Sequence, residues 1–394
     1  MSKSLNHITI ATYAHPELYP PILSAVHQLS RNSSGIDILT RNTLHSQWAY
    51  PSNVSVNFIN KNQYDGFNIE TISTYQKLQH FFKYVIMLKR ILKKNDSKIL
   101  IVHDVIPLFA AFLIKGFLKR NNVKLWYHNH DVTDISKAGN FSLMGIASKF
   151  EEKAFESIDI FTLPSKERLQ YFPIDKLKNK PIIIPNYPLE GFYGKVHSIK
   201  SNEQSQNRKT IKLVFQGSIG KGHGLEEIIG VLDKAVNEKE LQLHLVGKIR
   251  DAYLNELKSL VAEKGVGARF TYHGMQNFTK LPTILSQYDI GIAIHKPYNV
   301  TYSTGGTASN KIYEYAACRM PILLFDNEHY RGYLENRKWT FFTDLSSDSL
   351  LEQIKLMDDN LEKFSENAYE DFRNEFNFEK IFSERMDSTL SKLD

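Results

Sequence analysis

One stretch of the chain, residues 309–320 (SNKIYEYAACRM), combines polar, charged and small residues at helical spacing. It follows the pair Gly305-Gly306, so a small-residue loop opens onto a predicted helix N-terminus. Free backbone N–H groups and the helix dipole favour an anion at such an end. Glu314 lies four residues after Asn310, on the same helix face and about 6 Å further along. That is roughly the distance from a nucleotide's phosphates to its ribose, so the pattern predicts a sugar-nucleotide cradle with Glu314 on the ribose hydroxyls. The donor-binding residues expected here are Thr304, Gly305, Gly306, Thr307, Ser309, Asn310, Lys311 and Glu314.

A second glycine-rich stretch, residues 217–224 (GSIGKGHG), follows an apolar strand and precedes a helix. Four glycines in eight residues let the backbone approach a ligand closely, and Lys221 supplies a positive charge. The stretch is not a Walker loop, because no Gly-Lys-Ser/Thr ends it, and a plain tight turn stays open as an alternative. As the second wall of a diphosphate site it adds four residues to the donor-binding set: Gly217, Ser218, Lys221 and His223.

Histidines gather in the first half of the chain, where His128 and His130 alternate in an extended segment and so share one face. Three interpretations stay open: a metal site that lacks a defined third ligand, hydrogen-bonded structural histidines, or donors to a substrate hydroxyl. The same ambiguity applies to His103, which ends a strand. We expect His15, His103 and Asp131 to lie on the side of the site that binds the second substrate, the acceptor. No Gly-x-Ser-x-Gly elbow, spaced zinc cysteines or carboxylates paired by a motif are present, so a serine-hydrolase elbow, a cysteine zinc site and a glycosidase carboxylate pair are not indicated.

Length and composition predict a folded protein of two domains, because 394 residues exceed one ordinary core. The single cysteine, Cys318, excludes an intramolecular disulfide and suits a reducing compartment. No apolar run reaches the length of a membrane span, and the N-terminus enters a strand pattern without a signal-peptide core. We therefore expect a cytoplasmic protein.

Charge is unevenly spread: residues 1–196 carry 24 Lys/Arg against 15 Asp/Glu, although the whole chain is only +6. Two helical stretches mix basic and apolar residues, which suits a helix that rests on an anionic membrane surface at the inner face of the cell membrane. An ordinary amphipathic helix with its lysines in water is the alternative, and nucleic-acid binding is not expected because no nucleic-acid motif accompanies the charge. The basic residues concerned are Lys83, Lys89, Arg90, Lys93, Lys94, Lys115, Lys119 and Arg120.

Strand-like and helical stretches alternate throughout, the pattern of doubly wound α/β domains. The strands expected in the first half are 7–12, 36–40, 54–59, 98–103, 124–128, 158–163 and 182–185, with helices at 19–28, 72–94, 108–120 and 141–155. The second half should have strands at 211–216, 241–246, 269–272, 289–294 and 321–325, and helices at 225–237, 253–264, 280–287 and 309–318. The tail, about 350–392, reads as helical with an interruption near 374–377.

These elements predict two Rossmann-like domains that face a central cleft. We expect an N-terminal domain at 1–197, a polar linker at 198–210, a C-terminal domain at 211–365, and a helix at 366–394 that crosses back to the N-terminal domain. A ligand should lie at the carboxyl ends of the strands.

At these residues the chain resembles the GT-B glycosyltransferases, specifically the retaining family four, also called glycosyl transferases group 1. Residues 309–322 (SNKIYEYAACRMPI) match that family's Pro-Ser-Lys-Leu-Phe-Glu-Tyr-Met-Ala-x-Gly-Lys-Pro-Val pattern, and Pro185-Asn186 matches its Pro-Asn before the linker. The resemblance implies an acceptor-binding N-terminal domain and a nucleotide-sugar-binding C-terminal domain. It also implies an enzyme of the hexosyltransferase class in polysaccharide biosynthesis that requires no metal.

Carried over by position, the resemblance makes Glu314 the ribose ligand, the 306–310 backbone the diphosphate clamp and Lys221 the opposing cation. It places His130 at the donor sugar as the catalytic residue. The chain departs from the pattern at Gly306, where many members have a second glutamate, at Ser218 in place of an arginine, and at Arg319 in place of the helix-ending glycine.

The function expected is therefore transfer of a sugar, with retention, from a nucleotide-diphosphate donor to a hydroxyl of a cell-envelope or lipid-linked glycan. Two alternatives stay open: a catalytically silent relative that acts as a binding protein, and a sugar-nucleotide epimerase or hydrolase of the same fold.

Overall fold

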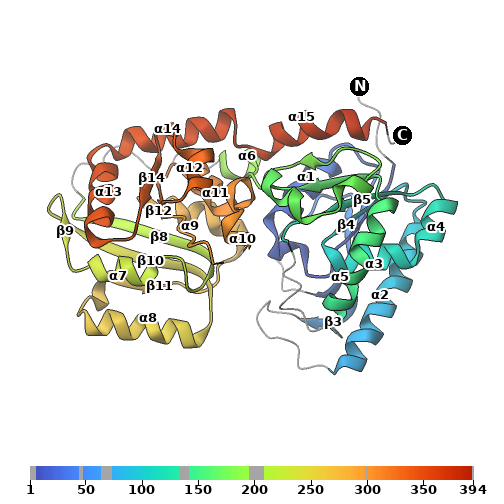
Figure 1. The fold of residues 1–394 in the computed structure, drawn as a ribbon, viewed down its shortest axis with the longest axis horizontal. Coiled ribbons are helices and arrows are strands. Elements are labelled where there is room, and N and C mark those ends of the chain that lie inside the picture. The colour runs from blue at the N-terminus through green and yellow to red at the C-terminus, as the bar shows by residue number, and fades with distance from the viewer. Residues whose placement is uncertain are drawn as a thin grey trace. The chain divides into compact units, whose positions relative to one another are not determined.

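The computed structural model describes residues 6–43, 48–63, 73–132, 142–194, 208–298 and 300–392. The chain divides into two compact units (Figure 1). The N-terminal unit comprises Met1–Pro185 with Glu379–Asp394, and the C-terminal unit comprises Asn186–Phe378. Each unit has its own sheet and its own apolar core. The predicted fold class, α/β with two Rossmann-like doubly wound domains, is confirmed.

The N-terminal unit contains a parallel sheet of order β3-β2-β1-β4-β5-β6-β7. Its strands are β1 (Ile8–Ala11), β2 (Ile36–Thr43), β3 (Val54–Gln63), β4 (Ile99–His103), β5 (Lys124–His128), β6 (Ile160–Leu163) and β7 (Ile182–Ile183). Its helices are α1 (Pro20–Ser30), α2 (Thr74–Lys94), α3 (Val105–Leu113), α4 (Lys115–Arg120), α5 (Leu143–Ala154) and most of α15 (Phe378–Leu390). The strand order reverses between β1 and β4, so residues that follow these strands lie at the switch point where such sheets bind ligands.

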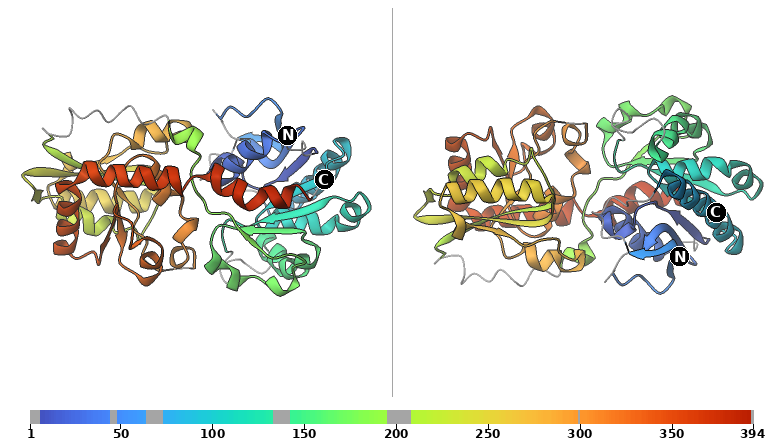
Figure 2. Two further views of the ribbon diagram at one scale, coloured as in Figure 1. Left: turned by 90° about the horizontal axis from the view of Figure 1, so that it is seen from above. Right: turned by 90° about the horizontal axis from the view of Figure 1, so that it is seen from below.

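The C-terminal unit repeats this plan with the order β11-β10-β8-β12-β13-β14, and β9 pairs antiparallel with β10. Its strands are β8 (Thr210–Ile219), β9 (Ala235–Val236), β10 (Lys239–Ile249), β11 (Phe270–Tyr272), β12 (Ile290–Ile292), β13 (Ile322–Phe325) and β14 (Thr340–Thr343). Its helices are α6 (Glu190–Tyr193), α7 (Leu225–Val231), α8 (Asp251–Glu263), α9 (Leu281–Leu285), α10 (Val300–Ser303), α11 (Asn310–Ala317), α12 (Glu328–Leu334), α13 (Ser347–Asp359) and α14 (Leu361–Asn374). Here the order reverses between β8 and β12. The two further views in Figure 2 show the helices of each unit packed around its own sheet.

Some helix boundaries differ from the prediction for identifiable reasons. The helix expected at 225–237 ends at Val231, because Ala235–Val236 forms the strand β9 instead. Asn237 and Glu238, with positive φ angles of 50° and 61°, then turn the chain from β9 into β10. The helix expected at 108–120 is broken at Ile114 into α3 and α4. The strand β14 and the helix α12 were not predicted.

The boundary between the units also differs from the prediction, since it lies after Pro185 rather than at residue 197. The backbone N–H of Asn186 donates to the carbonyl of Thr307 at 2.9 Å, so the chain joins the C-terminal unit at this point. The expected linker, 198–210, lies mostly outside the described residues. The return to the N-terminal unit occurs at Glu379 rather than at 366. None of the described helices combines the length and the apolar character that a membrane span needs.

Candidate functional site

The carboxyl end of β8 and the helix α11 meet through two side chains, Gln216 and Glu314. The Gln216 side-chain amide donates a hydrogen bond to a Glu314 carboxylate oxygen. Glu314 is only 3% exposed, and this burial raises the pKa of its carboxyl to about 7, although Gln216 and Lys311 act in the opposite direction. The predicted ribose ligand is thus a buried carboxyl whose position is fixed by a neighbouring strand.

Tyr315 fastens α11 to the same strand. Its hydroxyl accepts a hydrogen bond from the Gln216 backbone at 2.9 Å and donates one to the Val214 carbonyl at 3.1 Å. The Tyr315 ring lies against Gly291 of β12, where an added Cβ would come within 2.4 Å of a ring carbon. Because only glycine leaves this space, Gly291 and Tyr315 together set the distance between α11 and the sheet.

Lys311 brings a cation to this site. Its ammonium lies 3.9 Å from the centroid of the Phe215 ring, and a Cβ added at Gly217 would lie 3.9 Å from Cε of Lys311. Burial lowers the pKa of Lys311 to about 7, although the Glu314 charge acts to raise it. An anion that entered the site would stabilise the protonated form, so Lys311 is suited to bind a phosphate.

The loop before α11 owes its glycines to packing. A Cβ on Gly305 would lie 2.5 Å from the Tyr330 hydroxyl of α12, and a Cβ on Gly306 would lie 3.0 Å from Nε2 of His329. Gly306 opens a short 3₁₀ turn, Gly306–Ala308, that leads directly into α11. The Ser309 hydroxyl makes no capping hydrogen bond to α11 in the described structure. The N-terminal amides of this helix are therefore left to other acceptors.

The same segment carries the remaining predicted donor residues. The Thr304 hydroxyl donates a hydrogen bond to the Val300 carbonyl at 2.7 Å, at the end of α10. The Thr307 carbonyl accepts a hydrogen bond from the backbone N–H of Asn186. Oδ1 of Asn310 is buried without a hydrogen-bond partner among the described residues. A buried acceptor in that state is open to a ligand hydroxyl or amide.

Asn186 is a site component whose role the sequence did not reveal. Its side-chain amide donates to the Ala308 carbonyl at 2.9 Å, in addition to the backbone bond to Thr307. These two bonds hold the turn that precedes α11. The Pro185-Asn186 motif was a signal for this residue, but its partner lies 122 positions away in the sequence.

The glycine-rich stretch is arranged differently from the prediction. Strand β8 runs on to Ile219, so Gly217 and Ser218 pair with Gly247 and Lys248 of β10 instead of forming a loop. The structure does not bring Lys221 to Glu314: its side chain is 67% exposed, and its ammonium lies 2.8 Å from Glu256 of α8. Of the two predicted lysines, Lys311 is therefore the one whose charge acts on Glu314.

His223 is an interior residue. It is 1% exposed, its Nδ1 lies 3.1 Å from the Ile294 carbonyl oxygen, and its Nε2 lies 3.3 Å from the Tyr302 hydroxyl. Burial lowers the pKa of His223 to about 3, and the Lys311 charge contributes to the shift. The imidazole is therefore neutral, and both of its ring nitrogens are engaged by neighbouring groups of the C-terminal unit.

The N-terminal unit collects three histidines at the carboxyl ends of β4 and β5. His103 and His128 are register partners in adjacent strands, and His130 follows two residues later. The ring centroids of His103 and His130 are 5.0 Å apart, and those of His128 and His130 are 4.4 Å apart. Burial lowers the pKa of all three rings, well below the ordinary value for His103 and His130 and to about 3 for His128, so they are neutral at pH 7.

Two carboxylates adjoin the histidines. Asp104 accepts a hydrogen bond from the backbone N–H of His130 at 3.0 Å, and burial raises the pKa of Asp104 to about 7. Asp131 lies 3.4 Å from the Arg168 guanidinium, which also donates to the His130 carbonyl. The remaining predicted residue, His15, follows β1 and accepts at Nδ1 from the Glu17 backbone. Burial lowers the pKa of His15 to about 4.

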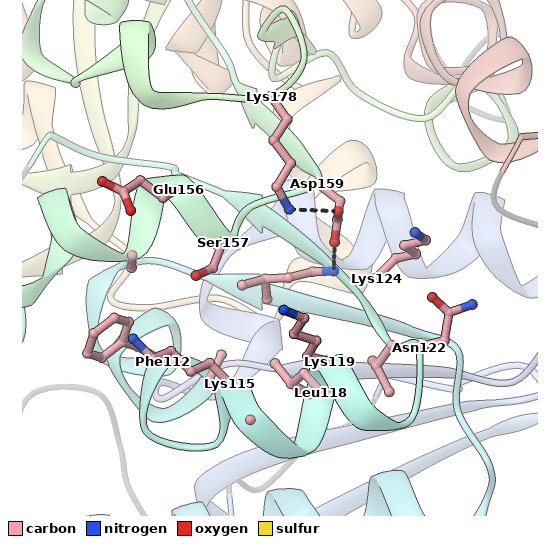
Figure 3. A pocket seen from close by; sticks show the side chains of 15 residues that line it. Phe112, Lys115, Leu118, Lys119, Asn122, Lys124, Glu156, Ser157, Asp159 and Lys178 are labelled. Atoms are coloured by element: carbon pink, nitrogen blue, oxygen red, sulfur yellow. Dashed lines mark hydrogen bonds and ion pairs between the residues drawn. The ribbon is translucent and has the colours of Figure 1, made fainter.

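A separate cationic pocket of about 600 Å³ opens at the amino ends of β5 and β6 (Figure 3). It is lined by Lys115, Lys119, Lys124 and Lys178, with Phe112 and Leu118 among its apolar residues. Lys178 lies 3.3 Å from Asp159, whereas no ion pair with Lys115, Lys119 or Lys124 occurs among the described residues. Glu156 and Asp159 also line the pocket, so its four lysines leave a net positive charge.

Comparison with known proteins adds three observations. Residues 198–371 match the family model of the glycosyl transferases group 1. No curated protein matches the sequence. Among solved structures the fold is similar to that of HepE from Anabaena in complex with UDP and glucose, at 14% identity over 98% of this chain and 100% of that one, with a TM-score of 0.64.

Two further structures share the fold at 12% identity. One is an α,α-trehalose-phosphate synthase (UDP-forming) from Burkholderia xenovorans in complex with glucose-6-phosphate, with coverage of 98% and 100% and a TM-score of 0.66. The other is WaaG, a glycosyltransferase involved in lipopolysaccharide biosynthesis, with coverage of 98% and 99% and a TM-score of 0.63. These likenesses establish the fold, and the family match covers the unit that carries Gln216, Lys311 and Glu314. The chain is therefore a glycosyltransferase of the GT-B fold, and its residues 198–371 form a domain of the glycosyl transferases group 1 family.

Proposed function

We propose that the protein transfers a sugar from a nucleoside diphosphate to a hydroxyl of a cell-envelope or lipid-linked glycan, with retention of the anomeric configuration. The observation that carries the proposal is the arrangement of Gln216, Lys311 and Glu314 at the β8–α11 junction, inside the segment that matches the family. A buried carboxyl and a half-buried ammonium three residues apart on one helix suit the ribose and the diphosphate of one ligand.

In this proposal the diphosphate of the nucleotide-sugar donor binds at the N-terminus of α11. The diphosphate would accept hydrogen bonds from the amides at the start of α11 and from Lys311. Glu314 would accept hydrogen bonds from the ribose hydroxyls. Thr304, Ser309 and Asn310 offer further polar groups in the same segment, whereas Lys221, which pairs with Glu256, is not assigned to the diphosphate.

The chemistry of this proposal requires stabilisation of the leaving nucleoside diphosphate. As the bond to the sugar breaks, negative charge grows on the β-phosphate, and Lys311 with the α11 dipole would offset that charge without a metal ion. His130 would donate a hydrogen bond from its neutral ring to a hydroxyl of the sugar. The acceptor oxygen would attack from the face that the leaving group vacates, and its proton would pass to an oxygen of the departing diphosphate, which gains negative charge as its bond to the sugar breaks.

The proposal also includes contact between the N-terminal unit and an anionic membrane surface, where a lipid-linked acceptor would lie. On α2 the apolar side chains of Phe82 and Ile86 are more than half exposed, and Lys89, Arg90, Lys93 and Lys94 are exposed further along the helix. The Lys89 ammonium lies 5.4 Å from the centroid of the Phe117 ring, so α2 adjoins α4 with its Lys115, Lys119 and Arg120. Exposed apolar residues beside clustered positive charge favour adsorption to anionic lipid headgroups.

A test starts with UDP-glucose, because structures of the same fold are named as complexes of UDP and glucose or as UDP-forming. The purified chain is incubated with a panel of UDP-, GDP- and CMP-sugars, with and without glycan acceptors. We expect transfer only when an acceptor is present. Isomerisation without an acceptor would indicate an epimerase, and nucleotide-sugar binding without any turnover would indicate a silent relative.

A further inference from the structure

The strand register places three imidazoles at one point of the N-terminal unit. His103 pairs with His128 across β4 and β5, and His128 and His130 are two residues apart, so their side chains extend to the same face. All three are buried, with exposures of 3%, 7% and 4% in that order. This convergence results from the fold, because His103 is 25 residues from His128 in the sequence.

The unsatisfied nitrogens of the cluster require an explanation. Both ring nitrogens of His103 and of His130, and Nε2 of His128, are buried without a hydrogen-bond partner among the described residues. Five such atoms in one cluster are unusual, since buried polar groups in folded proteins are nearly always paired. Because each neutral imidazole carries one lone pair, the cluster offers three nitrogen ligands to a single bound species.

The dimensions of the cluster suit a transition-metal ion. One ring nitrogen from each histidine lies within 4.8 Å of the other two. With zinc–nitrogen bonds of about 2.0–2.1 Å, a tetrahedral ion separates the centroids of two ligand rings by about 5.2 Å. The observed centroid separations are 5.0 Å for His103 and His130, 5.3 Å for His103 and His128, and 4.4 Å for His128 and His130. Ring rotations would orient the nitrogens, and the His128 and His130 rings would also have to move apart by about 0.8 Å.

The surroundings fix the ligands and supply charge. Nδ1 of His128 lies 2.7 Å from the Thr162 hydroxyl, which leaves Nε2 as its ligand atom in the way that outer hydrogen bonds orient metal-binding histidines. The Asp104 carboxyl is held beside the cluster by the His130 backbone, and Tyr19 stacks on the His130 ring with centroids 5.6 Å apart. The nearby Arg168 guanidinium is engaged by the His130 carbonyl and by Asp131.

We propose that His103, His128 and His130 form a binding site for one divalent transition-metal ion, with three imidazole ligands and a fourth position open to water. Imidazole nitrogen selects ions such as Zn²⁺ and Co²⁺, whereas Mg²⁺ and Ca²⁺ prefer oxygen ligands. The site does not depend on the proposed function. If His130 also contacts the donor sugar, as that function assumes, the ion would occupy its lone pair and would inhibit transfer rather than support it.

The experiment is a titration of the full chain with Co²⁺ and with Zn²⁺ after removal of metals by EDTA. We expect one equivalent of Co²⁺ to give the visible absorption of a tetrahedral site with three nitrogen ligands and one water. One equivalent of Zn²⁺ should displace the Co²⁺, and Mg²⁺ should leave the spectrum unchanged. Zn²⁺ should also raise the melting temperature of the chain. A parent protein that shows neither the Co²⁺ spectrum nor a Zn²⁺-dependent melting shift would overturn the proposal without any variant.

Variants locate the ion. His103→Gln and His128→Gln, made separately, should each weaken Zn²⁺ binding at least tenfold in calorimetry, with folding checked by circular dichroism. The matched control is His273→Gln, because His273 and His244 form another pair with ring nitrogens 3.1 Å apart and are the rival zinc ligands. Loss of binding in His273→Gln, with binding retained in either cluster variant, would contradict the assignment.

Discussion

The side-chain amide of Gln216, at the end of β8, donates a hydrogen bond to the buried carboxylate of Glu314 on α11. The adjacent Tyr315 hydroxyl bonds the backbone of the same strand on both sides of this contact. The carboxylate is therefore positioned before any ligand arrives, which lowers the ordering cost of binding. This relationship joins the predicted ribose ligand to a residue that the sequence did not single out.

Glu314→Ala should weaken UDP binding by about 1–3 kcal/mol, or about 5- to 150-fold, because charge-assisted hydrogen bonds to the ribose are lost. Isothermal titration calorimetry measures the change. Glu335→Ala, at an exposed glutamate just after α12, is the control and should bind UDP like the parent. Equal affinities of parent and Glu314→Ala would remove the ribose role.

Lys311→Met should reduce UDP affinity at least tenfold at pH 6.5, because the ammonium beside Phe215 is the cation assigned to the diphosphate. The comparison is Lys221→Met, in which the loss of an exposed ion pair with Glu256 should change affinity less than twofold. The sequence-based prediction gives the opposite order of effects, so the two variants decide between the two lysines.

The contribution of Lys311 should depend on pH. Burial holds the pKa of its ammonium at about 7, below the ordinary value, so in the free protein the cation is present below pH 7 and is lost above it. The ratio of parent to Lys311→Met affinity for UDP should therefore fall as pH rises from 6.5 to 9, by up to about tenfold per unit. Ionisation of UDP affects both proteins and cancels in the ratio. Glu314, whose pKa is also about 7, ionises over the same range and opposes the loss of the Lys311 proton, which makes the fall less steep. A ratio that stays constant over this range would show that Lys311 does not titrate there.

Gly291→Ala should destabilise the C-terminal unit by about 1–3 kcal/mol, because the new methyl group would collide with the Tyr315 ring. The displaced ring would also loosen α11, so UDP affinity should fall together with stability. Gly230→Ala in α7 is the matched control: nothing lies within 4 Å of its added Cβ, and it should be stabilising by about 0.5–1 kcal/mol. Denaturant melts of both variants measure the difference, and a neutral Gly291→Ala would contradict the packing argument.

Neutralising Lys89, Arg90, Lys93 and Lys94 together to Gln should reduce sedimentation with vesicles that contain anionic phospholipid, by about 1 kcal/mol per charge removed. The control carries Gln at four exposed lysines of the C-terminal unit, Lys258, Lys264, Lys338 and Lys363, and should sediment like the parent. If the parent does not sediment with such vesicles at low salt, the proposed membrane contact is wrong.

The sequence was sufficient for the βα alternation and for the helix α11, because apolar periodicity and the small-residue loop before Asn310 are local signals. It could not choose between Lys221 and Lys311, since that choice depends on a distant partner: Glu256 engages Lys221 on the surface, and Phe215 lies under Lys311. Exposure and pairing of this kind are properties of the fold.

Two further features depend on the tertiary fold and could not be predicted from local sequence. The convergence of His103 with His128 and His130 depends on which strands are neighbours, and the sequence supplied only two of the three ligands. The need for Gly305 was also hidden, because the Tyr330 hydroxyl that excludes a side chain there belongs to α12, a helix absent from the prediction.

The most direct test of the account is a crystal structure of the chain with a bound UDP-sugar. We predict that the diphosphate lies at the start of α11 within hydrogen-bond distance of the Lys311 ammonium, and that the ribose hydroxyls contact Glu314. A diphosphate bound at Lys221, or anywhere away from α11, would contradict the central claim.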